Sequence, residues 1–249
     1  MKTISLTPNS VFSGNLILVN ARYPLRLVAN TSQLSCVSGT ETLLSSCASR
    51  QLNLLIESLQ ASQKFVPVSG YRSKSEQEQI YQDSIRENGL DFTQCYVALP
   101  DCSEHQTGLA IDLAEKKAEI DFIRPEFPRN GLCGKFRALA AQYGWIERYL
   151  VGKESITGIS AEPWHFRYVG HPHAVLIQRS GMVLEEYIDF IKQYTYHGQH
   201  LLFKTRTEEY DICYQPVSDA VTLSVPDWPL SLSGNNVDGV ILTWRRDLS

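Results

Sequence analysis

The sequence has no long hydrophobic run and no excess of positive charge. The apolar run Leu16 to Val19 is far too short to cross a bilayer, and the first residues lack the charged and then apolar pattern of a secretory signal. Lysine and arginine number 23 against 27 aspartates and glutamates, which argues against a protein that neutralises many nucleic-acid phosphates. We therefore expect a cytoplasmic protein with neither membrane insertion nor nucleic-acid binding.

The sequence also lacks a Cys-x-x-Cys pair among its six cysteines. Without an export signal they are expected to be free thiols rather than a disulfide framework. Cys102 lies beside a histidine motif and is a candidate ligand, although a small, partly buried side chain is the expected role. The hydrophobic share of 43% and charged share of 20% are typical of a soluble globular protein.

The spacing of apolar residues predicts an α+β fold. Helical periodicity predicts helices at 50–63, 73–89, 134–143 and 183–194. Aliphatic and aromatic runs predict strands at 15–19, 65–68, 107–114, 145–150 and 164–169. Beyond residue 197, short strand-like runs alternate with turn residues. We expect a catalytic domain at 1–196 and a small β-rich extension at 197–249.

Two short segments carry the possible chemistry: Ser103 to Asp112, and Glu162 to His165. They offer His105, Asp112 and His165 as metal ligands. Two imidazoles and one carboxylate, with a fourth position left to water, describe a catalytic zinc site. Glu162 could be the general base that activates this water.

The spacing within each segment predicts its backbone. His105 and Asp112 are seven residues apart, so on one strand they would face opposite sides. We therefore expect His105 on a turn before the strand, with a bend at Gly108. Pro163 favours an extended or turn conformation for Glu162 to His165. Either segment alone matches many chains by chance, so the zinc-site hypothesis depends on the presence of both in one chain.

The pattern Ser-x-His-x-x-Gly-x-Ala-x-Asp with a later Glu-Pro-Trp-His resembles the zinc D-Ala-D-Ala peptidases of the VanX/VanY type. Residues 69–73 are similar to the arginine-bearing turn of that family, and residues 161–170 to its closing block. The resemblance covers about residues 50–194. It implies an antiparallel sheet with flanking helices, a fold that Hedgehog-like domains resemble. The chain looks most like the bifunctional VanXY type, while its tail is similar to that of VanY carboxypeptidases.

The resemblance implies zinc bound by His105, Asp112 and His165, with Glu162 as base and then as acid for the leaving amine. It also implies that Arg72 polarises the scissile carbonyl and stabilises the oxyanion, a role that suits a fixed guanidinium. The other interpretation of this arginine is a surface residue paired with Glu76 or Glu78.

The family pattern further suggests that Gln77 and Ser103 contact the substrate and that Trp164 walls the pocket. Their alternatives are a helix-surface glutamine, a loop serine and a core tryptophan. His173 is expected to be a structural or supporting residue.

The resemblance implies hydrolysis of the D-Ala-D-Ala dipeptide and of the terminal D-Ala of cytoplasmic muramyl-pentapeptide precursors, which contributes to vancomycin resistance. Two alternatives stay open: a D,D-carboxypeptidase that acts only on the precursor, and a non-catalytic zinc-binding module on the same fold. The sequence leaves the oligomeric state open.

Overall fold

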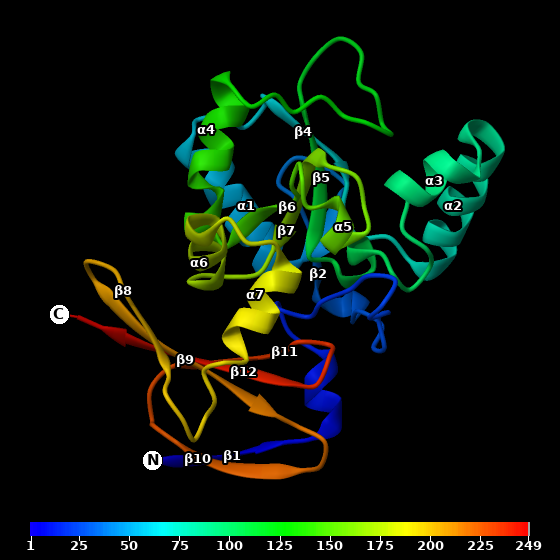
Figure 1. Cartoon of the computed structure of the whole chain (residues 1–249). Coiled ribbons are helices and arrows are strands. Elements are labelled where there is room, and N and C mark those ends of the chain that lie inside the picture. Colours follow the sequence, from blue (N-terminus) through cyan, green and yellow to red (C-terminus); the bar gives the residue numbers. More distant parts are fainter. Residues whose placement is uncertain (249) are drawn as a thin grey trace. The chain divides into compact units, whose positions relative to one another are not determined.

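The computed structural model describes residues 1–248, which form two compact units (Figure 1). One unit is residues 19–183, and the other joins residues 1–18 to the described residues from 184 on. The domain boundary expected after residue 196 stays a prediction. The compact units divide the chain elsewhere, because the first 18 residues join the C-terminal strands.

The unit 19–183 is built on a four-stranded antiparallel sheet. Its strands are β4 (Phe65–Ser69), β5 (Ala110–Glu115), β7 (Glu162–Tyr168) and β6 (Trp145–Tyr149), in the order β4-β5-β7-β6. A two-stranded sheet pairs β2 (Leu34–Cys36) with β3 (Leu43–Ser45). The molecule is therefore a mixed α/β protein with small antiparallel sheets, as expected.

The helices of this unit include three of the four expected ones and several short ones. They are α1 (Ser46–Ser58), α2 (Lys74–Asn88), α3 (Leu90–Tyr96), α4 (Gly131–Ala140), α5 (Glu154–Thr157) and α6 (His173–Ser180), with 3-10 turns η2 (Thr31–Gln33), η3 (Glu104–Thr107) and η4 (Ala141–Tyr143). The capping box expected at the start of α2 is present, because Ser73 and Glu76 each accept the other's backbone N–H.

A cluster of four phenylalanines holds the sheet of this unit against α4. Phe65 on β4, Phe166 on β7, Phe136 on α4 and Phe127 pack with ring centroids 5.0 to 5.5 Å apart. All four are buried. Offset and edge-to-face aromatic contacts stabilise beyond the area they bury, so this cluster fixes the strands that carry the site.

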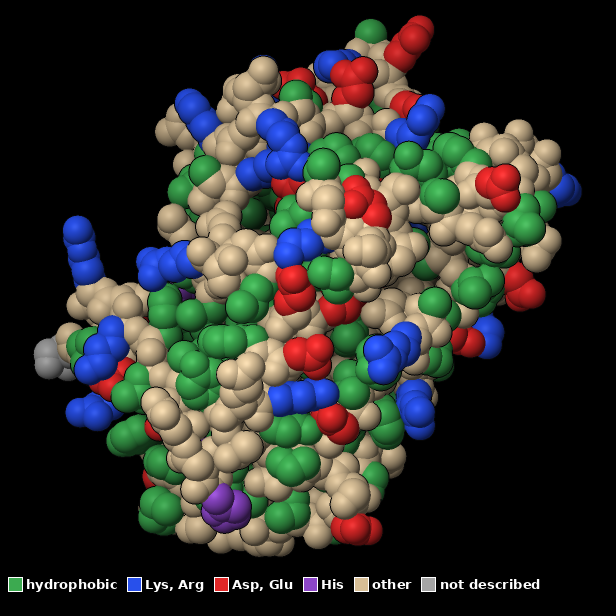
Figure 2. Space-filling view, viewed as in Figure 1, with side chains coloured by type: hydrophobic (Ala, Val, Ile, Leu, Met, Phe, Trp, Pro, Cys, Tyr) green, Lys and Arg blue, Asp and Glu red, His purple; other side chains and the backbone are tan. Residues whose placement is uncertain are grey.

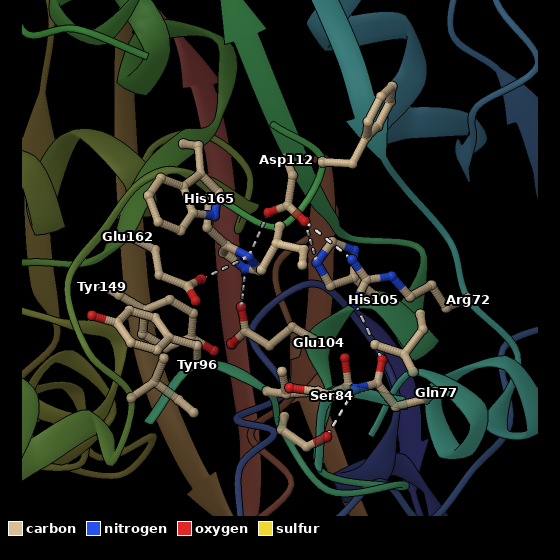
Figure 3. Close-up of a pocket in the computed structure, with 18 of the residues that line it drawn as sticks. Arg72, Gln77, Ser84, Tyr96, Glu104, His105, Asp112, Tyr149, Glu162 and His165 are labelled. Carbon is tan, nitrogen blue, oxygen red and sulfur yellow. Dashed lines mark hydrogen bonds and ion pairs between the residues drawn. The ribbon is translucent and has the colours of Figure 1, made fainter. Parts of the chain in front are cut away.

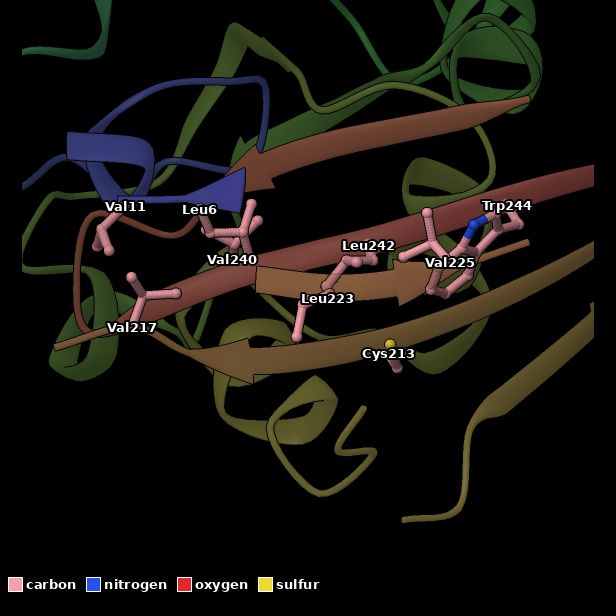
Figure 4. Close-up of a cluster of buried hydrophobic side chains, with 9 residues drawn as sticks. All are labelled: Leu6, Val11, Cys213, Val217, Leu223, Val225, Val240, Leu242 and Trp244. Carbon is pink, nitrogen blue, oxygen red and sulfur yellow. The ribbon is translucent and has the colours of Figure 1, made fainter. Parts of the chain in front are cut away.

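The second unit is mainly β-structure, as expected for the tail. It contains η1 (Pro8–Phe12), α7 (Leu184–Ile191), the pair β1 (Lys2–Leu6) and β10 (Val221–Val225), and a sheet of β11 (Leu230–Gly234), β12 (Gly239–Asp247), β9 (Glu208–Pro216) and β8 (Leu201–Lys204). Its core joins Leu6 and Val11 from the N-terminus to Leu223, Val240 and Leu242 (Figure 4). Ile4 and Leu6 alternate with Thr3 and Ser5, a period typical of a strand, although β1 is not among the strands predicted from the sequence.

All six cysteines are free, as expected. On the face shown in Figure 2, side chains of both charges are interspersed. Among residues 1–248, helices that combine enough length with enough apolar character to cross a membrane are absent.

Candidate metal centre and its cavity

His105, Asp112 and His165 come together in the unit 19–183. One ligand atom from each lies within 4.8 Å of the others, and all three residues are buried. Asp112 on β5 and His165 on β7 are direct cross-strand partners, which places their side chains side by side. His105 lies in the turn η3, and Gly108 ends that turn in the left-handed conformation with φ of 69°. The turn expected before the strand is thus confirmed.

The two imidazoles have defined orientations. Nδ1 of His105 lies 2.7 Å from the carbonyl oxygen of Gly70, which can only accept, so Nδ1 carries the proton and Nε2 is left as the free donor atom for a metal. This Nε2 lies 3.2 Å from Asp112 Oδ2. Nδ1 of His165 lies 3.0 Å from Asp112 Oδ1. Each imidazole therefore presents one nitrogen to the aspartate.

These atoms fit a zinc ion. Ligands bound about 2.0 Å from a tetrahedral zinc lie roughly 3.3 Å from one another, close to the separations found here. Two imidazoles and one carboxylate are also a donor set of catalytic zinc sites. Cys102 lies outside this group of convergent ligand atoms, as expected.

Glu162 begins β7 and faces the same site. Its Oε2 lies 3.6 Å from His165 Nδ1. Residues three apart on a regular strand would face opposite sides. Here the β6–β7 register shifts, because Glu147 pairs with Phe166 and Tyr149 with Glu162. The extra residues on β7 break the alternation and bring Glu162 to the side of His165. The extended conformation expected from Pro163 is confirmed.

Arg72 points into the site from the turn between β4 and α2. Its guanidinium donates to Ser69 Oγ at 2.7 Å, Asp112 Oδ2 at 3.2 Å and Gln77 Oε1 at 3.3 Å. Glu76 bonds instead to Ser73, in the capping box. The interpretation of Arg72 as a surface arginine paired with Glu76 therefore loses its support.

The ligand group opens into a cavity of about 350 Å³ (Figure 3). Gln77, Ser103 and Trp164 line it and are buried, with 1%, 3% and 8% of their surface exposed. Gln77 is thus not a helix-surface residue. Its amide nitrogen donates to the carbonyl oxygen of Ala98. A cavity of this size suits a small ligand.

Several other residues line the cavity without a role predicted from the sequence, among them Glu104, Tyr96, Tyr149 and Phe122. Glu104 is adjacent to His105, so a charged residue beside the motif was the signal available for it. Tyr149 ends the strand β6, and its ring lies 4.9 Å from that of His165.

The buried charges shift one another's protonation. Burial raises the pKa of Glu162 to about 8, and His165 only partly opposes this. Burial also acts to raise the pKa of Asp112, but His105 and His165 outweigh it and hold this pKa below its usual range. Burial and Arg72 lower the pKa of His105. A buried cluster with carboxylates at its centre suits a bound cation.

Comparisons with known proteins agree with this chemistry. The profile of the family described as VanY, D-alanyl-D-alanine carboxypeptidase, matches residues 41–171. The bifunctional D-Ala-D-Ala dipeptidase and D-Ala-D-Ala carboxypeptidase VanXYC of Enterococcus gallinarum is 40% identical over 183 residues, which cover 72% of this chain and 96% of that protein.

Two solved structures are informative. The vancomycin-resistance D,D-dipeptidase VanXYg, in complex with a D-Ala-D-Ala phosphinate analogue, matches with a TM-score of 0.95 and 47% identity, and the match covers 98% of this chain and 99% of that one. A mutant of the D,D-pentapeptidase VanY from the VanB-type resistance cassette, in complex with Zn(II), matches with a TM-score of 0.55 and 29% identity, over 70% of this chain and 98% of that one.

Proposed function

The chain belongs to the VanY family of D-alanyl-D-alanine carboxypeptidases, and from this membership we propose that it hydrolyses D-Ala-D-Ala bonds in two substrates. These are the free dipeptide and the muramyl-pentapeptide precursor that ends in D-Ala-D-Ala. The observation that carries the proposal is the match along 98% of the chain to a D,D-dipeptidase that binds a D-Ala-D-Ala analogue. Loss of that precursor would contribute to vancomycin resistance, and we propose that the protein acts in the cytoplasm, where both substrates are made.

Zinc is the proposed cofactor, held by His105, Asp112 and His165. Their convergent atoms support this assignment, as does the zinc complex of the VanY relative. When bound, zinc would supply a Lewis acid that polarises the scissile carbonyl and lowers the pKa of water.

Glu162 is the proposed general base and acid. Its carboxylate takes a proton from the attacking water and then delivers it to the nitrogen of the departing D-alanine. A group that both accepts and returns a proton works best with a pKa near the working pH. Burial, which raises the pKa of Glu162 to about 8, moves it in that direction.

Arg72 is proposed to stabilise the negative charge that develops on the carbonyl oxygen. Its hydrogen bonds to Ser69 and Gln77 hold the guanidinium at the edge of the metal group. A donor fixed before the reaction stabilises the transition state without a cost of reorganisation. Gln77 and Ser103 are proposed to contact the end of the substrate, and Trp164 to form a wall of its pocket.

The decisive measurement is zinc content together with D-alanine release from both substrates, with and without a chelator. We expect stoichiometric zinc, release from both substrates, and loss of release after chelation. Release from the precursor alone would refute the dipeptidase activity and leave a D,D-carboxypeptidase.

The substitution Glu162→Gln tests the general base. It keeps the size of the side chain but removes the proton acceptor, so turnover should fall by about 10²- to 10⁴-fold while zinc stays bound. Metal analysis of the purified variant checks the second point. Turnover near the parent rate would refute this role for Glu162, whereas a parent that binds zinc without turnover would favour a non-catalytic zinc module on a Hedgehog-like fold.

A further inference from the structure

Glu104 is a fully enclosed carboxylate to which the proposed mechanism gives no step. It lies in η3, directly before His105, and its side chain has no exposed surface. Its Oε1 accepts hydrogen bonds from two buried arginines, at 2.8 Å from Arg148 Nε on β6 and at 2.7 Å from Arg167 Nη1 on β7. Two guanidiniums therefore hold one oxygen of this carboxylate and leave the other free to act elsewhere.

The other oxygen of Glu104 faces His165. Oε2 lies 3.6 Å from His165 Nε2, as the dashed line between them in Figure 3 marks. Among the described residues, both atoms are buried and neither has a hydrogen-bond partner. An unmade hydrogen bond between buried polar atoms costs on the order of 1–3 kcal/mol, so a small approach of the two side chains is favoured.

The remaining contacts of His165 show which nitrogen belongs to the metal. Its Nδ1 lies 3.0 Å from Asp112 and 3.6 Å from Glu162, on the side of the metal group. Its Nε2 lies on the other side of the ring and faces Glu104. A neutral imidazole donates a lone pair from one nitrogen and carries a proton on the other. Ligation through Nδ1 thus requires the proton on Nε2.

We propose that Glu104 is a positioning residue for the metal, which accepts the Nε2–H of His165 and so directs the Nδ1 lone pair at the ion. This inference rests on the proposed zinc centre. A carboxylate behind a ligating histidine fixes its tautomer and ring orientation. Arg148 on β6 and Arg167 on β7 hold the carboxylate in place, so the support of His165 comes from its own strand and from one neighbouring strand.

His105 provides an internal comparison. Its remote nitrogen donates to a backbone carbonyl, that of Gly70, which no side-chain substitution removes. The remote nitrogen of His165 faces a side chain instead. The contribution of this support to metal binding is therefore measurable at His165 by substitution of Glu104.

The test compares Glu104→Gln with Glu147→Gln, a control that removes another carboxylate held by two arginines, Arg129 and Arg137, outside the metal group. Zinc affinity is measured by competition with a chromophoric chelator, on purified, metal-free full-length protein shown to be folded by circular dichroism. We expect Glu104→Gln to weaken zinc binding by about 10- to 100-fold, the usual effect of losing such a partner. Glu147→Gln should lower the melting temperature but leave zinc affinity close to that of the parent.

Either of two results would overturn the inference: parent-like zinc affinity in folded Glu104→Gln, or equal weakening in Glu147→Gln. If Glu104→Gln does not fold, the double variant Glu104→Gln/Arg148→Met replaces it, since removing a charge with its buried partner is tolerated better than removing one alone. Parent-like zinc affinity of this folded double variant would likewise overturn the inference. D-alanine release by the parent is measured in parallel. A parent that binds zinc but does not release D-alanine would refute the proposed function and leave the inference about Glu104 intact.

Discussion

His173 is a buried histidine at the start of α6, outside the candidate metal group. Burial, with a smaller effect of His171, lowers its pKa from 6.5 to about 3. The unfolded chain therefore takes up this proton near pH 6.5, whereas the folded protein resists it until about pH 3. The stabilisation of the folded state by neutral His173 is therefore complete above pH 6.5 and is lost as the pH falls towards 3.

We expect the free energy of unfolding to fall by about 1.4 kcal/mol per pH unit through this group in that window. Urea unfolding at several pH values measures the slope. His173→Gln should flatten it, while His197→Gln, at an exposed position, should not. Equal slopes in the parent and His173→Gln would show that other groups dominate acid unfolding.

Arg72 offers a second prediction. Lysine keeps the positive charge but lacks the fork that reaches Ser69, Gln77 and Asp112 at once. Arg72→Lys should therefore lower kcat by about 100-fold or more, as expected for loss of a fixed oxyanion donor, and retain zinc. Steady-state assays with metal analysis check this, with the exposed Arg206→Lys as control. An unchanged kcat would exclude Arg72 from transition-state stabilisation.

The residues of the metal group could be proposed from the sequence because their types are few and their chemistry is specific. The role of Glu104 could not be proposed from the sequence. Its partners Arg148 and Arg167 lie 44 and 63 positions away, and the pairing of β6 with β7 brings them together. The roles of Glu162, Arg72, Gln77, Ser103 and Trp164 remain predictions, although all five lie at one cavity.

At the scale of elements, the phenylalanine cluster connects α4 with β4 and β7. Phe136→Ala should destabilise the protein by about 3–5 kcal/mol, because it leaves a cavity between helix and sheet. Phe122, with 71% of its surface exposed, is a matched control whose replacement by alanine should cost little. Guanidinium unfolding measures both. Similar losses for the two variants would mean that the cluster does not hold α4 to the sheet.

Element prediction succeeded where a local signal was strong. The capping box located α2 almost to the residue, and the apolar runs located β4, β6 and β7. The helices α3, α5 and α6 were missed because none is longer than eight residues, too short to show several turns of periodicity. The register shift in β7 depends on the partner strand, which the sequence does not reveal.

At the scale of the molecule, all candidate site residues fall within residues 19–183. A relative that is matched over 96% of its own length covers only 72% of this chain, which supports an active shorter form. We expect residues 19–183 alone to bind zinc and release D-alanine from the dipeptide. A fragment of residues 1–196 should aggregate more than residues 19–183, since Leu6 and Val11 lose their core partners. Size-exclusion chromatography and activity assays check this, and an unfolded 19–183 fragment would contradict it.

The fold class and the β-rich tail could be predicted, whereas the discontinuity of the second unit could not. The pairing of residues 2–6 with residues 221–225 depends on contacts between the two ends of the chain. Local patterns predict a strand but carry no information about which distant strand it pairs with.

The pairing of β1 with β10 has a consequence for synthesis on the ribosome. Once β1 is made, roughly 200 further residues must be added before its partner exists, which takes about 10 to 40 s at typical elongation rates. In contrast, the whole of residues 19–183 is complete before β10 is made. Nascent chains therefore carry an unsatisfied strand edge, with Ile4 and Leu6 open to chaperones or to other nascent chains, for most of their time of translation.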